Sequence, residues 1–493
     1  MTAVAESDRL PRAAAAAAAA LGLAVIVRLW AMPLSSSLWL DEFGTVWVTD
    51  GGFAQILERA RLFPQSIPYA GIVAATRAGL GSSEAALRLP SLLAMLAAVW
   101  ALFRTVRGLL GTSLGFLAAG VFLLFPPIEF AAADARPYAF GVLFAILATG
   151  GLARWLERGG AGNAAVYAVC GAATVYFQYL FATLFAAHAL YVLWRRRRGA
   201  PVPWPGIAAT AAAIGVLLLP AARLAAEIGR DRAAHAFGVL PSAAALFHAL
   251  VPTRVLGLLV PALLVAFATR LARRFRLERP QGPALDAIVL FGLSAGVPPL
   301  VLFGIARITA TPVFDARYLI VTAPAWAALL GWLLAAVKPA AGRAATLAAA
   351  LALAVVLRGE LGHRAIAHAR EEWRGAVAAL NAGEGPLPVF LSGTFIESKD
   401  AALVADRRHR DYLRAPLAYY RPRGPVDVLP LRADDGVEAR VGRFPDDAFA
   451  LVERSSRFPS WTPWLEGRGW ASREVFRSPA LTVRVFDRRT PGG

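Results

Sequence analysis

The sequence predicts an all-α polytopic membrane bundle followed by a small C-terminal domain that contains both helices and strands. Two observations support the membrane class. First, 57% of the residues are hydrophobic and the mean hydropathy is +0.54, and these residues form long runs; a helix needs about 20 of them to cross the hydrocarbon core. Second, only 17% of the residues are charged, against roughly 25% in an ordinary soluble domain.

About eleven runs are long enough to be transmembrane helices. The first run follows Arg9 and Arg12 and resembles a signal peptide, but no convincing cleavage site follows it, so we interpret it as an uncleaved span. The predicted spans cover residues 13–31, 85–103, 112–131, 137–154, 163–178, 180–194, 206–225, 246–269, 286–306, 317–337 and 341–357. We therefore expect a transmembrane domain over residues 1–357, with a long outer loop at 32–84, and a soluble domain over residues 358–493.

The basic residues predict the orientation, because cytoplasmic loops carry an excess of arginine and lysine. Arg195–Arg198 and the arginines within residues 270–279 fall on the same side of the membrane as the N-terminus. We expect a multi-pass protein of the bacterial inner membrane, with a cytoplasmic N-terminus and an extracytoplasmic C-terminal domain. The formal charge of +18 reflects these loops. No basic stripe interleaved with aromatic residues is present, so no nucleic-acid partner is expected.

Outside the spans, a few segments have a recognisable pattern. Residues 53–63 have the apolar spacing of a short helix at the membrane interface. In the tail, residues 371–383 form an amphipathic pattern that ends at a glycine, which predicts a helix. Three tail segments alternate as strands do, at residues 386–393, 449–456 and 481–489. These segments predict one small mixed α/β domain.

The first candidate site is the adjacent pair Asp41 and Glu42, which follows the first span on the predicted outer face and lies among Trp39, Leu40 and Phe43. Partial burial among apolar groups raises the pKa of a carboxyl group and makes it a competent proton acceptor. The alternative is that both acids cap a short helix, since acidic residues stabilise helix starts.

Two further groups stand at the outer ends of spans. Asp134 and Arg136 precede the fourth span, where a carboxylate and a guanidinium could contact an acceptor hydroxyl and a phosphate. Arg317 and Tyr318 begin the tenth span, where the helix N-terminus adds a positive field for a phosphate. The alternatives are a local ion pair at a helix start and an arginine beside an interfacial tyrosine. Since all three groups lie on one predicted face, a common function is favoured.

Other chemistries lack support in the sequence. The histidines that could bind a metal show no ligand spacing: His235, His248, His363, His368 and His409. We therefore predict no metal site. No glycine-rich phosphate loop or nucleophile elbow is present, which argues against an ATPase and a serine hydrolase.

Four motifs resemble those of the GT-C membrane glycosyltransferases of the protein O-mannosyltransferase and aminoarabinose-transferase group. Members typically have S-L-W-x-D-E-A after the first span, E-A-R-x-Y-A before the fourth, R-Y-L before a late span, and an E-x-W-R-x-A helix opening the outer domain. The corresponding segments here are Ser37–Phe43, Asp134–Ala139, Arg317–Leu319 and Glu371–Ala376. Two segments depart from the group: F-P-Q-S-I-P-Y at residues 63–69 replaces H-P-P-L-Y, and F-Q-Y at residues 177–179 replaces H-Y-F.

The resemblance implies an inverting glycosyltransferase that moves a sugar from a polyprenyl-phosphate donor to an acceptor hydroxyl on the extracytoplasmic face. Asp41 would be the catalytic base, Glu42 an orienting partner or acceptor contact, and Asp134 a second acid near the acceptor. The donor phosphate would be bound by Arg136, Arg317 and Tyr318. This chemistry requires no cofactor, although a divalent metal is compatible with it. The partners would be the donor, membrane lipids, and an acceptor lipid, glycan or protein.

The main alternative is a transporter or flippase of a lipid-linked anion. Such a protein also needs arginines and acids, but at mid-bilayer depth and on broken helices. The candidate residues here lie at the outer ends of the spans, which favours an enzyme. A third hypothesis is an inactive scaffold whose outer domain binds a partner, and the retained acid pair argues against it.

Overall fold

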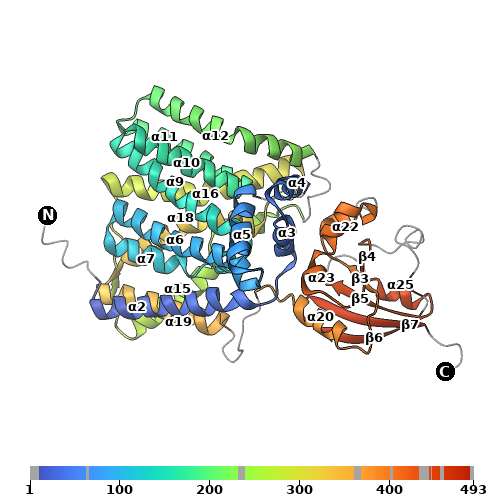
Figure 1. Cartoon of the computed structure of the whole chain (residues 1–493). Helices are drawn as coiled ribbons and strands as arrows, with labels where there is room; N and C mark the ends of the chain where they lie inside the picture. The colour runs from blue at the N-terminus through green and yellow to red at the C-terminus, as the bar shows by residue number, and fades with distance from the viewer. Residues whose placement is uncertain are drawn as a thin grey trace.

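The computed structural model describes residues 10–62, 66–230, 239–359, 368–399, 404–431, 444–445, 447–455 and 460–488. The chain forms a bundle of long helices with a smaller domain at one end (Figure 1). The first described helix, α2 (Arg12–Val25), begins at the end of the bundle opposite to this domain (Figure 1). Two of the histidines considered above, His235 and His363, lie outside the described residues.

The bundle is built from helices that follow the predicted apolar runs. The first helix, α2 (Arg12–Val25), continues through the single-turn segments η1 (Ile26–Ala31) and η2 (Met32–Ser35). The later helices are α6 (Glu84–Leu110), α7 (Thr112–Phe122), α8 (Pro126–Ala132), α9 (Tyr138–Arg158), α10 (Ala161–Phe177), α11 (Leu184–Arg197), α12 (Trp204–Arg230), α14 (Ala243–Leu250), α15 (Thr253–Ala268), α16 (Gly282–Thr309), α17 (Ala316–Leu319), α18 (Ala323–Ala335) and α19 (Ala340–Arg358). Buried small residues such as Ala118, Ala328 and Ala350 let these helices pack closely.

The number of spans differs from the prediction. Within the described residues, seven helices are long and apolar enough to cross a membrane, or up to nine if the bent pairs α7–α8 and α14–α15 each count as one span. The bends are 75° and 49°. Each of the eleven predicted runs overlaps a helix or a bent pair, but α10 and α11 have only 17 and 14 residues. The count of eleven is therefore not confirmed, because a hydropathy run does not reveal where a helix bends or stops.

Three short helices of the first outer loop lie at the end of the bundle that faces the smaller domain (Figure 1). They are α3 (Leu40–Val48), α4 (Phe53–Leu62) and α5 (Ile67–Leu80). The helix predicted from residue 53 is confirmed by α4. The sequence analysis did not predict α5, although Ser66 caps its start by accepting a hydrogen bond from the Tyr69 N–H at 3.4 Å.

The C-terminal domain is built around a five-stranded mixed sheet of order β4-β3-β5-β7-β6. The strands are β3 (Val389–Ser392), β4 (Val426–Val428), β5 (Ala448–Arg454), β6 (Trp470–Arg477) and β7 (Leu481–Arg488). Strand β3 is parallel to β4 and β5, whereas β5–β7 and β7–β6 are antiparallel. The helices are α20 (Trp373–Asn381), α22 (Arg407–Leu413), α23 (Ala415–Tyr420) and α25 (Thr462–Glu466). The predicted mixed α/β domain is confirmed.

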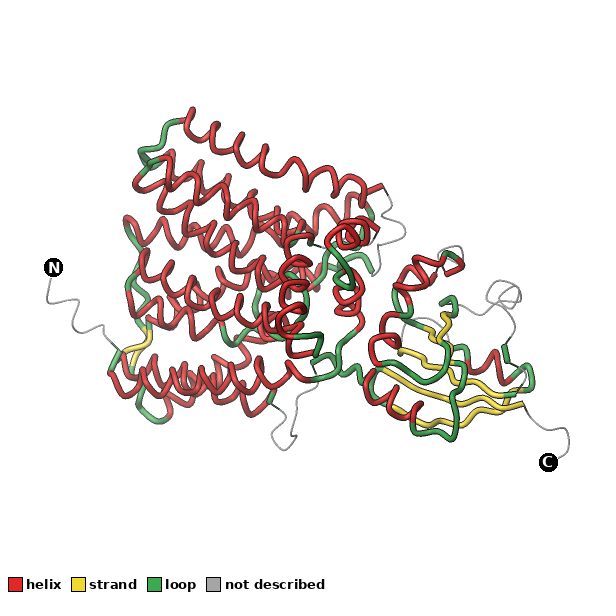
Figure 2. Tube along the Cα trace, in the orientation of Figure 1, coloured by secondary structure: helices red, strands yellow, loops and turns green. Residues whose placement is uncertain are grey.

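The three predicted strands correspond to β3, β5 and β7, and two strands were missed. Strand β4 has only three residues, and the edge strand β6 carries exposed polar residues that weaken its alternation. The remaining strands form a two-residue pair, β1 (Arg274–Phe275) with β2 (Val337–Lys338). This pair lies at the end of the bundle opposite to the C-terminal domain (Figure 2).

One apolar cluster joins the outer loop to the C-terminal domain. It contains Leu38 and Phe43 from the loop together with Trp373, Leu391 and Val483 from the domain, all fully buried. The rings of Phe43 and Trp373 meet edge to face, with centroids 5.9 Å apart. Burial of such aromatic surface favours a fixed position of α3 against the domain.

Candidate active site

The acid pair lies in the first turn of α3. Trp39 is the N-cap residue, with extended backbone angles, and the carboxylate of Glu42 accepts a hydrogen bond from the Trp39 N–H at 3.0 Å. A glutamate at this third helical position satisfies a backbone donor that the helix itself leaves unpaired. Acidic residues in the first turn also complement the helix dipole. The helix-start interpretation is thus correct for Glu42.

The side chain of Glu42 is fully buried in an ion pair with Arg88 of α6, which is also fully buried. The Arg88 Nε and Nη2 atoms donate to the two carboxylate oxygens at 2.7 and 2.5 Å, and the Ala135 N–H donates at 2.7 Å. With the bond from Trp39, the carboxylate accepts four hydrogen bonds. Breaking such a buried pair costs about 3–5 kcal/mol, so Glu42 holds the start of α3 against the bundle.

The side chain of Asp41 contacts Arg317, and not the buried Arg88 that pairs with Glu42. Its carboxylate is 23% exposed and accepts a hydrogen bond from the Arg317 Nη1 atom at 2.7 Å. Arg136 Nη1 donates to the Asp41 backbone carbonyl at 3.3 Å. Asp41, Arg136 and Arg317 come from three separate segments of the chain, and the structure brings them together at one place.

Arg317 is oriented by its own helix start. Asp315 is the N-cap residue of α17, and its carboxylate accepts hydrogen bonds from the Arg317 N–H at 3.0 Å and the Arg317 Nε atom at 3.2 Å. The Tyr318 ring centroid lies 5.8 Å from the guanidinium carbon of Arg317, which is within the range of a cation–π contact. The guanidinium of Arg317 is 23% exposed and so remains accessible to an anion.

Asp134 lies behind Trp39. Its Oδ1 atom accepts a hydrogen bond from the Trp39 Nε1 atom at 3.0 Å, and the residue is fully buried. Burial, followed by the negative charge of Glu42, raises the pKa of Asp134 well above its ordinary value, while the bond from Trp39 opposes this shift. In this arrangement Asp134 supports the ring of Trp39.

Comparison with known proteins agrees with this architecture. Residues 67–222 match a family model described as dolichyl-phosphate-mannose-protein mannosyltransferase. No curated protein matches the sequence. Among solved structures, the chain is similar to ArnT from Cupriavidus metallidurans bound to undecaprenyl phosphate, with a TM-score of 0.55 and 11% identity, and to the same protein in the apo state, with a TM-score of 0.45 and 12% identity. Each comparison covers 95% of this chain and 97% of the other.

The chain has a GT-C fold. The likeness to the undecaprenyl-phosphate-bound structure extends over nearly the whole length of both chains and concerns the fold. The predicted fold class, a polytopic helical bundle with a small C-terminal α/β domain, is confirmed. The predicted resemblance is supported by the mannosyltransferase family model over residues 67–222 and, for the fold, by the likeness to ArnT.

Within this GT-C fold, the sequence analysis missed one side chain that shapes the site, Arg88, and set aside another, His368. Arg88 lies near the outer end of the second predicted span, and an ionisable residue at such a depth is itself a signal of function. His368 belongs to the segment before α20, and its ring stacks on Phe130 with centroids 4.1 Å apart. Burial, followed by the positive charge of Arg88, lowers the pKa of His368 well below its ordinary value.

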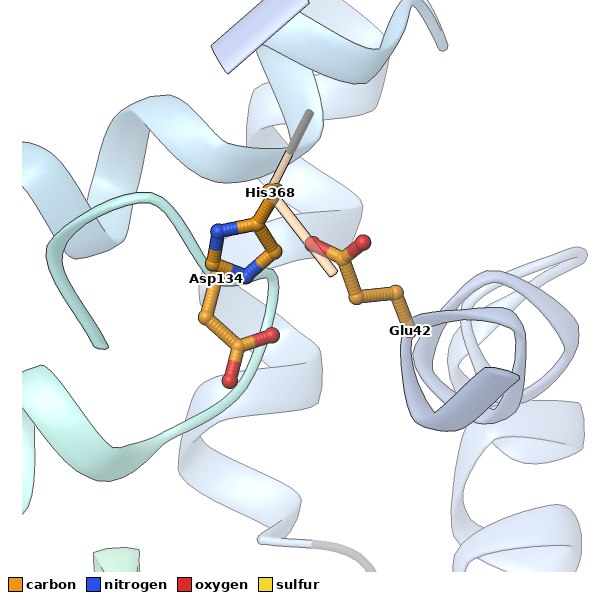
Figure 3. Close-up of side chains that lie close together, drawn as sticks. All are labelled: Glu42, Asp134 and His368. Carbon is orange, nitrogen blue, oxygen red and sulfur yellow. The ribbon is translucent and has the colours of Figure 1, made fainter. Parts of the chain in front are cut away.

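Figure 3 shows the three side chains that come closest to a metal site among the described residues: one donor atom each from Glu42, Asp134 and His368 lies within 4.8 Å of the others. The oxygens of Glu42 are already occupied by the guanidinium of Arg88 and by backbone donors. A divalent cation would also lie beside this positive charge. Asp134 Oδ2 and His368 Nε2, which have no hydrogen-bond partner, therefore provide two free ligands rather than three. The expectation that the reaction requires no metal stays a prediction.

Proposed function

We propose that this GT-C-fold protein is an inverting glycosyltransferase that uses a polyprenyl-phosphate sugar as donor and a hydroxyl group as acceptor. The observation that carries the proposal is the contact between Asp41 and Arg317, together with the hydrogen bond that Arg136 donates to the Asp41 backbone carbonyl. A partly exposed carboxylate and two guanidinium groups are the parts that a proton transfer and a phosphate leaving group require.

The donor phosphate fits Arg317 best. Guanidinium groups bind phosphate oxygens through strong charge-assisted hydrogen bonds, and Arg317 stands at the outer end of a span, where a lipid-anchored phosphate would arrive. The ArnT structure of similar fold was solved with undecaprenyl phosphate bound. Because Arg317 is paired with Asp41 in the free protein, a bound phosphate would compete for the guanidinium and release the carboxylate. Donor binding would thus leave the Asp41 carboxylate available to accept a proton.

The reaction then follows from these positions. Asp41 accepts the proton of the acceptor hydroxyl while the oxygen of that hydroxyl attacks the anomeric carbon of the donor sugar. A new bond from carbon to the acceptor oxygen forms as the bond from carbon to the phosphate oxygen breaks, which inverts the configuration. The polyprenyl phosphate leaves with the bonding electrons, and Arg317 and Arg136 stabilise its developing charge. No nucleotide is needed for this step.

The other predicted site residues take supporting roles in this proposal. Glu42 orients α3 through Arg88 and thereby sets the direction of Asp41. Asp134 holds the Trp39 ring in place. Tyr318 lies against Arg317 and would border the donor phosphate. The acceptor, which we expect to be a lipid, a glycan or a protein, would approach the exposed side of Asp41.

We further propose that the N-terminus is cytoplasmic and that the active site and the C-terminal domain lie outside the bacterial inner membrane. The excess of arginines at the other end of the bundle supports this orientation. Reporter fusions placed after Arg198 and after Arg358 should then report opposite sides. Two cytoplasmic signals would contradict the orientation.

The direct test of the function is an assay with the purified protein in detergent and radiolabelled polyprenyl-phosphate sugars, using a panel of acceptor lipids, glycans and peptides. Transfer of label to an acceptor, lost in folded Asp41→Asn, would support the proposal. A transporter or flippase of a lipid-linked anion would instead move labelled donor across proteoliposome membranes without transferring the sugar. That outcome would replace the proposed function.

A further inference from the structure

A side chain of the C-terminal domain reaches the start of α3. The Glu371 Oε2 atom accepts a hydrogen bond from the Leu40 N–H at 2.9 Å, and Leu40 is the first residue of α3, next to Asp41. The same oxygen accepts a bond from the Trp373 Nε1 atom, and Oε1 accepts one from the Arg454 Nε atom, both at 2.9 Å. Glu371 is 5% exposed, so its three bonds are shielded from water.

The segment before α3 is held from two sides. From the bundle, the Arg88 Nη1 atom donates to the carbonyl of Ser36 at 2.7 Å. From the C-terminal domain, the Tyr420 hydroxyl accepts a bond from the Leu38 N–H at 3.0 Å. The position of α3 therefore depends on contacts from both the helical bundle and the C-terminal domain.

We infer that Glu371 is a positioning residue for Asp41, and that the C-terminal domain is for this reason part of the active site. The inference rests on the proposed function. The first N–H groups of a helix have no partner within the helix, and Glu371 supplies one for the residue that precedes Asp41. Without it, the first turn of α3 loses an anchor and Asp41 moves relative to the anomeric carbon. A displacement of about 1 Å in an active site can cost on the order of 100-fold in rate.

Glu453 offers a matched control. It is also a glutamate of the C-terminal domain, its side chain is 12% exposed, and it accepts hydrogen bonds from Ser460, Trp461 and Thr462 within the domain. A change at Glu453 thus disturbs a carboxylate network of the same domain that is distinct from the bond between Glu371 and Leu40. A role in domain stability alone would give Glu371→Ala and Glu453→Gln the same phenotype.

The experiment compares Glu371→Ala, Glu371→Gln and Glu453→Gln in the full-length protein. We expect kcat of Glu371→Ala to fall by about 10- to 100-fold with little change in the KM for the donor, since the donor contacts of Arg317 are intact. Glu371→Gln keeps one oxygen for the Leu40 N–H and should recover part of the rate. Glu453→Gln should keep the wild-type kcat even where its melting temperature falls. Equal kcat values in folded Glu371→Ala and wild type would overturn the inference.

A double variant asks whether Glu371 acts through Asp41. In the Asp41→Asn background, Glu371→Ala should cause no further loss, because the group that it positions is already disabled. An undiminished loss in that background would overturn the inference.

Hydrogen exchange separates this inference from the proposed function, because it needs no activity. The peptide covering residues 38–44 should exchange faster in Glu371→Ala than in Glu453→Gln. Equal exchange in the two variants would overturn the positioning role. If the variants differ as expected but the wild-type protein transfers no sugar, only the proposed function is contradicted.

Discussion

Replacement of Asp41 by asparagine tests the proposed base most directly. The substitution keeps the shape of the side chain and keeps an oxygen that can accept the hydrogen bond from Arg317 Nη1. It removes the ability to take up a proton. A positioned general base contributes about 10²–10⁴-fold to a rate, so turnover of Asp41→Asn should fall by that factor, equivalent to roughly 3–5 kcal/mol of transition-state stabilisation.

The same substitution should leave the fold intact. Asp41 and Arg317 are each 23% exposed, and an ion pair that retains contact with water is worth only about 0–1 kcal/mol. The buried pair of Glu42 with Arg88, which holds the helix, is unchanged. We therefore expect a melting temperature within about 4 °C of the wild type.

The assay measures single-turnover and steady-state transfer from a labelled polyprenyl-phosphate sugar, with the melting temperature of the purified variant in the same detergent. Single turnover separates the chemical step from product release. A folded Asp41→Asn protein that transfers sugar at the wild-type rate would refute the assignment of the base. A large rate loss with a large loss of stability would instead assign Asp41 a structural role.

Three other variants test the surrounding groups. Arg317→Lys keeps the charge but loses the planar fork, so the KM for the donor should rise by about 10-fold or more at unchanged melting temperature; an unchanged KM would show that Arg317 is only an interfacial anchor. Glu42→Gln leaves Arg88 with a neutral partner in a buried site, so the melting temperature should fall by the equivalent of about 3–5 kcal/mol, and a wild-type melting curve would contradict the ion-pair role. Because the pKa of Asp134 is raised in the folded state, the folded protein binds more protons than the unfolded chain, and stability falls as pH rises from about 3.9 through the folded pKa. Asp134→Asn removes this dependence, so its melting temperature relative to the wild type should increase between pH 5 and pH 8, and a constant difference would contradict the raised pKa of Asp134.

The sequence predicted that Asp41, Arg136 and Arg317 lie close together, and the structure places them in contact. Asp41, Arg136 and Arg317 each follow or precede an apolar run, and the distribution of inner arginines put all three on one face before any distance was known. Helices that pack side by side bring their ends together, so residues at the outer ends of different spans share a small surface. The contacts of Asp41 with both arginines agree with that reasoning.

The buried layer was not predictable in the same way. Arg88 and Glu42 are 46 residues apart in sequence, and Glu371 and Leu40 are 331 apart; no spacing rule connects them. His368 was set aside because no second histidine stands at ligand spacing, yet its neighbours Glu42 and Asp134 come from other segments. Local patterns report helices and their faces, whereas these contacts depend on how the loop, the bundle and the domain pack.

The adjacent acids Asp41 and Glu42 illustrate how packing assigns different roles to similar residues. Successive residues of a helix point in directions about 100° apart, so two neighbouring acids in the first turn cannot face the same surroundings. Glu42 faces the bundle, where a buried guanidinium and two backbone donors hold it in place. Asp41 faces Arg317, and both side chains are 23% exposed, so in the proposed reaction a donor phosphate competes for this guanidinium. In the proposed reaction Asp41 therefore changes its partner, whereas Glu42 keeps Arg88 and so holds the helix that carries Asp41.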